Sequence, residues 1–179
     1  MTRASNMTAI QKAMGRLPHT PARSRPALSL IPGSRTAHED PRWPHVAAAL
    51  AALRDSKRHA VRIVDADCSG GALLIEAVRH ARSLGFTAIE GHGVDGSPLL
   101  IGRARAAATR LADPAIGLDF ELADMAQALA READFPADIV LWHGSLAEDH
   151  RPGVAAALAA AGNLVIGDPL IGAGARRSE

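Results

Sequence analysis

Short apolar runs alternate with helix-spaced segments through most of this 179-residue chain. The run AVRIVD at 60–65 has the length and the β-branched content of a strand, and segment 70–85 then places its apolar residues at helical spacing. Four further strand candidates lie at 89–96, 117–124, 137–144 and 163–168. This alternation predicts an α/β, Rossmann-like fold with an open, doubly wound, mostly parallel five-stranded sheet and helices on both faces.

Residues that favour helix ends separate these segments. Pro44 suits the first turn of a helix, Ser97 suits an N-cap followed by Pro98, and Gly85 and Gly162 suit helix ends. In the third strand candidate, the alternation predicts three side chains that point inward: Leu118, Phe120 and Leu122.

The first forty residues differ from the rest in composition. They contain no acidic residue before Glu39, several arginines and four prolines. A transit peptide has this composition, but a flexible arm is the simpler interpretation. We therefore expect a flexible arm at 1–40 and one domain at 41–179, with LSLI at 28–31 as the one strand-like stretch of the arm.

Charge and cysteine content exclude several classes of function. A formal net charge of +1, without a cluster of Lys and Arg among aromatic residues, gives no case for nucleic acid as a partner. The single cysteine excludes an internal disulfide framework and a cysteine-based zinc site, and no other metal site is expected. No apolar stretch is long enough to span a bilayer. We expect a soluble, cytoplasmic protein.

Ligands of doubly wound sheets bind beyond the carboxyl ends of the strands. Acidic residues close four of the five predicted strands. The residues at these ends are Asp65 to Gly71, Asp95 to Ser97, Asp124 with Met125, His143 to Ser145, and Asp168.

These segments resemble motifs of the class I S-adenosylmethionine-dependent methyltransferases, from about Pro44 to Pro169. The stretch VDADCSGG is similar to the family's first motif, and GVDGSPLLIGRARAAA is similar to its second. FELADM and ADIVLWHGSL resemble the third and fourth. The resemblance implies S-adenosylmethionine as the cofactor, and it implies these binding residues: Asp65, Asp67, Cys68, Ser69, Gly71, Asp95, Gly96, Ser97, Asp124 and Met125. His143 is the candidate catalytic residue.

Physical chemistry is compatible with these roles. Glycines after the first strand let the backbone approach a cofactor, and the next helix offers free N–H groups to a carboxylate. Asp95 can accept hydrogen bonds from both ribose hydroxyls, as acidic residues do in dinucleotide folds. Asp124 can accept from the adenine amino group, and Met125 can pack on the ring.

Each candidate also has a structural interpretation. Asp65 and Asp95 can cap turns, and Asp124 can be the N-cap of the helix that starts at Met125. Cys68 is best read as a small wall residue, because no base is evident beside it. His143 can be structural. His150 fits a solvated turn better than a metal site.

The chain departs from the family in two ways. Asp67 and Ser69 stand where the family has glycine, and only Gly71 keeps the third glycine. The last two strands of the family's sheet also have no counterpart, so 163–168 would be an open apolar edge. A homodimer or the segment 28–31 can cover that edge, and we favour the homodimer slightly.

Three functions are compatible with the sequence. A compact methyltransferase that acts on a small molecule comes first, and a non-catalytic or regulatory relative that binds the same cofactor comes second. An NAD-dependent oxidoreductase comes third, because the first turn lacks Gly-x-Gly-x-x-Gly. The sequence does not identify the methyl acceptor.

Overall fold

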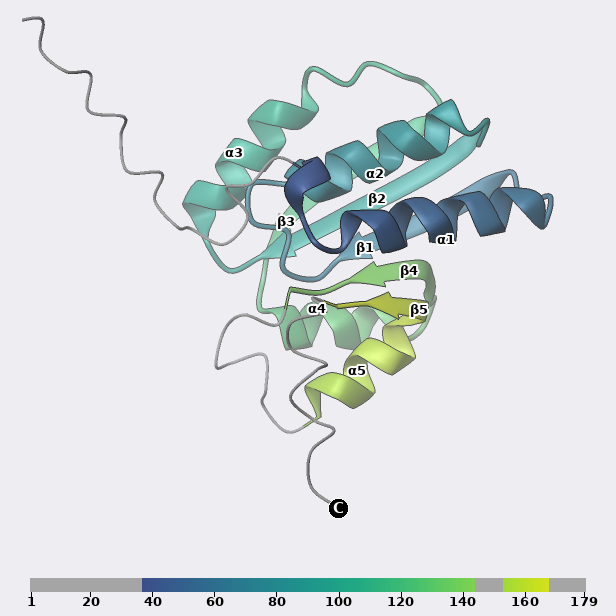
Figure 1. The fold of residues 1–179 in the computed structure, drawn as a ribbon. Coiled ribbons are helices and arrows are strands. Elements are labelled where there is room, and N and C mark those ends of the chain that lie inside the picture. Colours follow the sequence, from purple (N-terminus) through teal and green to yellow (C-terminus); the bar gives the residue numbers. More distant parts are fainter. Residues whose placement is uncertain (1–36, 144–152, 168–179) are drawn as a thin grey trace, which may run out of the picture.

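A computed structural model describes residues 37–143 and 153–167 of the chain. Within them, five strands form one sheet in the order β3-β2-β1-β4-β5, and all neighbouring strands are parallel (Figure 1). The strands are β1 Ala60–Asp65, β2 Ala88–Asp95, β3 Ile116–Leu122, β4 Ala137–Leu141 and β5 Gly162–Ile166. The predicted α/β sheet is confirmed. Segment 28–31, His150 and Asp168 lie outside the described residues.

Helices connect the strands in the expected alternation. They are a short 3-10 helix η1 Ala37–Glu39, then α1 Trp43–Asp55, α2 Ala72–Ser83, α3 Pro98–Ala108, α4 Met125–Glu132 and α5 Val154–Ala161. Pro44 lies in the first turn of α1, and the Ser97 hydroxyl accepts a hydrogen bond from Leu100 N at the start of α3. Gly85 follows α2 with a φ of 90°, a conformation that residues with a Cβ rarely adopt.

The helices cover both faces of the sheet. On one face, apolar side chains of α1, α2 and α3 form the larger core with β1–β5. On the other face, Leu129 of α4 and Leu158 of α5 pack against Val64 and Val140. Figure 1 shows α1, α2 and α3 on one side of the strands and α4 and α5 on the other. The doubly wound arrangement is therefore confirmed.

One inward-facing residue was predicted wrongly. Phe120 is buried and Leu118 is half-buried, but Leu122 is 48% exposed. Leu122 is the last residue of β3, which is an edge strand, and the helices leave this end of the strand open to solvent. Alternation gives the direction of a side chain but does not show where the covering layer ends.

The parallel ladders differ in length. β2 and β3 align over seven residue pairs, and β1 and β2 align over six. β1 and β4 align over only three pairs, from Ile63↔Ile139 to Asp65↔Leu141. The sheet thus consists of a three-stranded and a two-stranded part, which meet along a short ladder at the carboxyl end of β1.

Gly71 requires glycine for two independent reasons. Its φ is 76°, in the left-handed region. A Cβ at this position would also lie 2.7 Å from Cζ of the buried Phe120 ring. By contrast, Gly96 in the next strand-end turn has no atom within 4 Å of such a Cβ and no left-handed φ.

We expect Gly71→Ala to lower the free energy of unfolding by about 2–4 kcal/mol, because it adds backbone strain to overpacking against Phe120. The matched change Gly96→Ala should stay within about 0.5 kcal/mol of the wild type. Urea unfolding followed by circular dichroism measures both. Equal effects of the two changes would contradict the packing described for Gly71.

Candidate functional site

The turn after β1 crosses the carboxyl ends of three strands. Ala66 N donates to Leu141 O of β4 at 2.9 Å, and Cys68 N donates to Val94 O of β2 at 2.9 Å. Gly71 N donates to Cys68 O at 2.8 Å, just before α2. Backbone bonds therefore fix the turn at the position where ligands of doubly wound sheets bind.

Ser69 adopts a conformation that usually needs glycine. Its φ is 50°, and the residue is buried. Residues other than glycine, asparagine and aspartate are uncommon in this left-handed region of backbone conformation. The turn therefore keeps a left-handed backbone even though serine occupies the glycine position of the resembled motif.

Asp95 connects the turn after β1 with the turn after β2. Its Oδ2 accepts a hydrogen bond from Ser69 N at 3.0 Å, and its Oδ1 accepts from Ser97 N at 2.7 Å. The residue is 7% exposed. The alternative interpretation of Asp95, as a turn cap, is confirmed. A ribose contact is compatible with it, because each carboxylate oxygen can accept a second hydrogen bond.

Arg42 joins the site from outside the predicted motifs. It directly precedes α1, is 3% exposed, and forms a two-pronged pair with Asp40 through Nε at 3.0 Å and Nη2 at 2.9 Å. Its Nη1 lies 4.0 Å from Oδ1 of Asp65. Arg42 was not predicted as a site residue, because no spacing or motif in the sequence relates the start of α1 to the turn after β1.

Asp65 is a buried carboxyl group with an unusual pKa. It is 1% exposed, and neither oxygen accepts a hydrogen bond of normal geometry; Arg42 Nη1 also lacks an acceptor. Burial raises the pKa of Asp65 to about 7, Arg42 opposes this rise, and the charges of Asp67 and Asp40 add to it. Asp65 thus changes its charge near neutral pH.

The neighbouring groups respond to the same charges. Burial raises the pKa of Asp40, but the hydrogen bonds from Arg42 outweigh burial and leave the value below its usual range. Burial raises the pKa of the Cys68 thiol strongly, and the charges of Asp65, Asp95 and Asp67 raise it further. Cys68 is buried, so it is a wall residue and not a thiolate nucleophile.

Asp124 and Met125 lie at the carboxyl end of β3. Asp124 is exposed, and its Oδ1 accepts from Gln127 N at 3.1 Å, which confirms the predicted N-cap of α4. Met125 is half-buried against the core under α4 and α5.

His143 lies just beyond β4 and is half-buried. His143 also lowers the pKa of Asp40, the partner of Arg42. The structure therefore brings His143 to the same edge of the sheet as the turn after β1, as predicted.

The site has features that fit S-adenosylmethionine. A Cβ on Gly70 or on Gly96 would meet no atom within 4 Å, so there is open space beside both turns. The buried oxygens of Asp65 can accept from an ammonium group, and Arg42 Nη1 can donate to a carboxylate. Asp67 is the feature that fits less well, because its charge opposes that of a ligand carboxylate.

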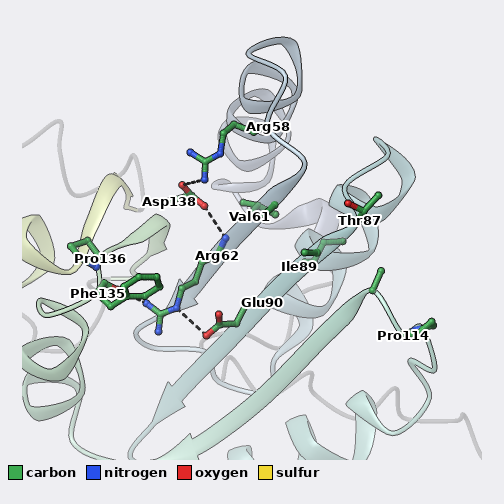
Figure 2. A pocket seen from close by; sticks show the side chains of 13 residues that line it. Arg58, Val61, Arg62, Thr87, Ile89, Glu90, Pro114, Phe135, Pro136 and Asp138 are labelled. Atoms are coloured by element: carbon green, nitrogen blue, oxygen red, sulfur yellow. Dashed lines mark hydrogen bonds and ion pairs between the residues drawn. The ribbon is translucent and has the colours of Figure 1, made fainter.

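A cavity of about 470 Å³ lies at the opposite edge of the sheet, beside the first residues of β1 and β2. Figure 2 shows that its charged side chains point toward one another. Arg58 pairs with Asp138 at 2.8 Å, and Arg62 pairs with Glu90 at 3.0 Å beside the Phe135 ring. Because these charges neutralise each other, the strand carboxyl ends remain the better candidate site.

In the described part of the chain, no three His, Cys, Asp or Glu side chains are placed to hold a metal ion. None of the helices in residues 37–143 and 153–167 is long and apolar enough to cross a membrane.

No family model matches the sequence, and no curated protein matches it. Among solved structures, monomeric WbdD is 19% identical, with 70% of this chain and 30% of that chain covered and a TM-score of 0.55. A structure of the bifunctional kinase-methyltransferase WbdD is 18% identical, with 69% and 27% covered and a TM-score of 0.51. Magnesium protoporphyrin IX methyltransferase from Synechocystis PCC 6803 with bound SAH is 18% identical, with 68% and 53% covered and a TM-score of 0.47.

The chain shares a fold with the WbdD structures, which include a bifunctional kinase-methyltransferase. The fold expected from the resemblance is therefore confirmed, and at these identities the similarity shows the fold alone. The chain spans less than a third of the length of the WbdD chains that it matches.

The pKa of Asp65 has a consequence for stability. Between its usual value of 3.8 and about 7, the folded protein holds a proton that the unfolded chain releases, so stability falls as the pH rises through this window. Asp65→Asn should therefore raise the free energy of unfolding at pH 8, on the order of 2–4 kcal/mol, with little gain at pH 4.

Urea unfolding at the two pH values measures this difference. The exposed Asp134 provides the control, because Asp134→Asn should change stability equally little at both. The same gain from Asp65→Asn at pH 4 and pH 8 would contradict a raised pKa.

Proposed function

We propose that this protein is an S-adenosylmethionine-dependent methyltransferase that acts on a small molecule. The observation that carries the proposal is the junction made by Asp95, whose carboxylate holds Ser69 N and Ser97 N and so aligns two strand-end turns around open space. The methyltransferase fold supports it, since the WbdD structures include a kinase-methyltransferase. A reducing, cytoplasmic location is part of the proposal, because the one cysteine is buried and unpaired.

The described residues have distinct roles in this proposal. Asp95 accepts from the ribose hydroxyls with the lone pairs that its backbone bonds leave, and Asp65 accepts from the ammonium group of the cofactor. Gly70 and Gly96 leave room for the ligand beside the backbone. Asp124 and Met125 are proposed to contact adenine, and the N-cap bond of Asp124 uses only one of its acceptor sites.

Bound S-adenosylmethionine supplies a methyl group on a positively charged sulfur, and a nucleophile displaces it directly. The protein mainly aligns the acceptor and excludes water, with a base where the nucleophile carries a proton. His143 is the candidate base, because it lies at the carboxyl edge beyond β4.

Ligand binding tests the cofactor. S-adenosylhomocysteine at about a hundred times its dissociation constant should stabilise the protein by about 2.7 kcal/mol, seen as a raised melting temperature. Asp95→Asn should reduce the affinity. It should also lower the stability of the free protein by about 1–3 kcal/mol, because one backbone N–H loses its acceptor. No thermal shift at millimolar S-adenosylmethionine or S-adenosylhomocysteine would contradict the proposal.

A non-catalytic relative that binds the same cofactor is the second candidate. It is favoured by Asp67 and Ser69, which replace two glycines of the motif and can alter the position of the cofactor. Formation of S-adenosylhomocysteine from S-adenosylmethionine in the presence of a panel of small acceptors separates the two candidates. Binding without turnover would favour the second, and NAD binding in place of S-adenosylmethionine would favour an oxidoreductase.

We also propose that β5 pairs with a second copy of the chain. β5 is an edge strand whose Leu164 and Val165 are 44% and 37% exposed. A groove of about 470 Å³ runs beside it, lined also by Ala48 and Ala49 of α1. The β5 edge therefore has exposed apolar side chains beside an apolar groove. A two-fold interface requires such a self-complementary surface, because each copy must fit the same surface of the other.

Light scattering tests this proposal. The wild type should have about twice the chain mass of 18.6 kDa, and Leu164→Lys should convert it to a monomer. Leu99→Lys is the control, since Leu99 is 63% exposed on α3 and should leave the dimer intact. A version of the chain that starts at Asp40 tests whether the N-terminal arm covers β5 instead. If only this shortened version associates, the arm protects β5 in the full chain.

A further inference from the structure

We infer that Arg42 is a positioning residue for Asp65 at the end of β1: its Nη1, 4.0 Å from Oδ1 of Asp65, offsets the negative charge that Asp67 brings to a glycine position of the motif. Through this compensation Asp65 stays able to hold the ammonium group of the ligand. This inference rests on the proposed function, and it adds a residue that none of the four motifs contains.

Arg42 occupies a position that a cation normally avoids. A cation at a helix N-terminus is disfavoured by the helix dipole, yet Arg42 is the N-cap residue of α1. It is also almost fully buried, which is costly for a guanidinium group unless carboxylates surround it. The location of Arg42 is therefore explained by its partners and not by the needs of the helix.

The partners divide the guanidinium between two tasks. Asp40 occupies Nε and Nη2 at 3.0 and 2.9 Å, and its Oδ1 also accepts from the Arg42 backbone N at 2.9 Å. These hydrogen bonds to Asp40 orient the third guanidinium nitrogen, Nη1, which lies 4.0 Å from Oδ1 of Asp65. At that distance Arg42 acts on Asp65 by its charge and leaves both Asp65 oxygens able to accept from a ligand.

The groups around Asp65 act on its pKa in opposite directions. Arg42 lowers the pKa of this buried carboxyl group, whereas Asp67 and Asp40 raise it. Asp40 is itself paired with Arg42, and His143 helps to lower the pKa of Asp40. The thiol of Cys68, in the turn after β1, also faces the charges of Asp65 and Asp67. Glycine at position 67 would add no charge, so the aspartate creates a cost that Arg42 reduces.

Two measurements on the full chain test the inference. Calorimetry gives the affinity for S-adenosylhomocysteine and for 5′-methylthioadenosine, which shares the nucleoside but lacks the amino-acid end. Carbon-13 NMR of the ligand-free protein gives the titration of the Asp65 carboxyl group. The variants are Arg42→Gln, Arg42→Lys, Asp67→Gly and the double variant. Arg54→Gln is the control, because Arg54 lies on α1 but bonds backbone carbonyls at Leu84 and Arg58.

Arg42→Gln should weaken S-adenosylhomocysteine about tenfold at pH 7 and leave 5′-methylthioadenosine within about twofold, since contacting charges couple on this scale. Arg42→Lys should retain most of the affinity. As a single change, Asp67→Gly should tighten the binding of S-adenosylhomocysteine. In the double variant it should restore the affinity that Arg42→Gln loses. The Asp65 titration should move above its wild-type midpoint in Arg42→Gln and below it in Asp67→Gly.

Several outcomes would overturn the inference. An unchanged Asp65 titration in Arg42→Gln, equal losses for the two ligands, or a double variant no better than Arg42→Gln would each assign Arg42 a purely structural role. If the wild type binds neither ligand, the proposed cofactor is wrong, and the carboxyl titration still decides whether Arg42 offsets Asp67. If Arg42→Gln fails to fold, Arg42→Lys and Asp67→Gly give the same comparison.

Discussion

The buried carboxylate of Asp95 is the interaction on which the candidate site depends. Its two oxygens accept from Ser69 N and Ser97 N, so one side chain holds the turns after β1 and β2 together. A backbone N–H buried without an acceptor is costly, and the turn after β1 would have one at Ser69 if Asp95 were absent. The geometry of a left-handed Ser69 and of the start of α2 thus depends on a residue from another strand.

Much of the fold follows from sequence pattern. β1 was predicted at 60–65 with the bounds that the structure has, because an apolar, β-branched run there stops at a turn. The N-cap at Ser97 and the glycine after α2 were also predicted correctly, since local chemistry determines them. Leu122 was wrong, because periodicity gives no information about where the layer of helices ends.

The candidate site was predicted less completely. The sequence placed Asp65, Asp95 and His143 at one edge, since the carboxyl ends of parallel strands meet there. It could not show that Asp95 holds two backbone N–H groups or that Arg42 approaches Asp65, because both contacts join elements that are distant along the chain. Charged residues that only the folded chain brings together cannot be recognised from their spacing in the sequence.

The short ladder between β1 and β4 has a consequence for motion. Three residue pairs join the two parts of the sheet, whereas seven join β2 to β3. Partial opening of a native protein tends to follow such boundaries, because separating them exposes the fewest backbone bonds. We therefore expect β4, α5 and β5 to part from β1 first, with the bonds from Arg58 and from Arg62 N to Asp138 as the main links that resist it. The crossing Ala66 N–Leu141 O bond lies at this boundary. Amide hydrogen exchange would report the boundary as faster exchange at Ala66 than at the amides of β2.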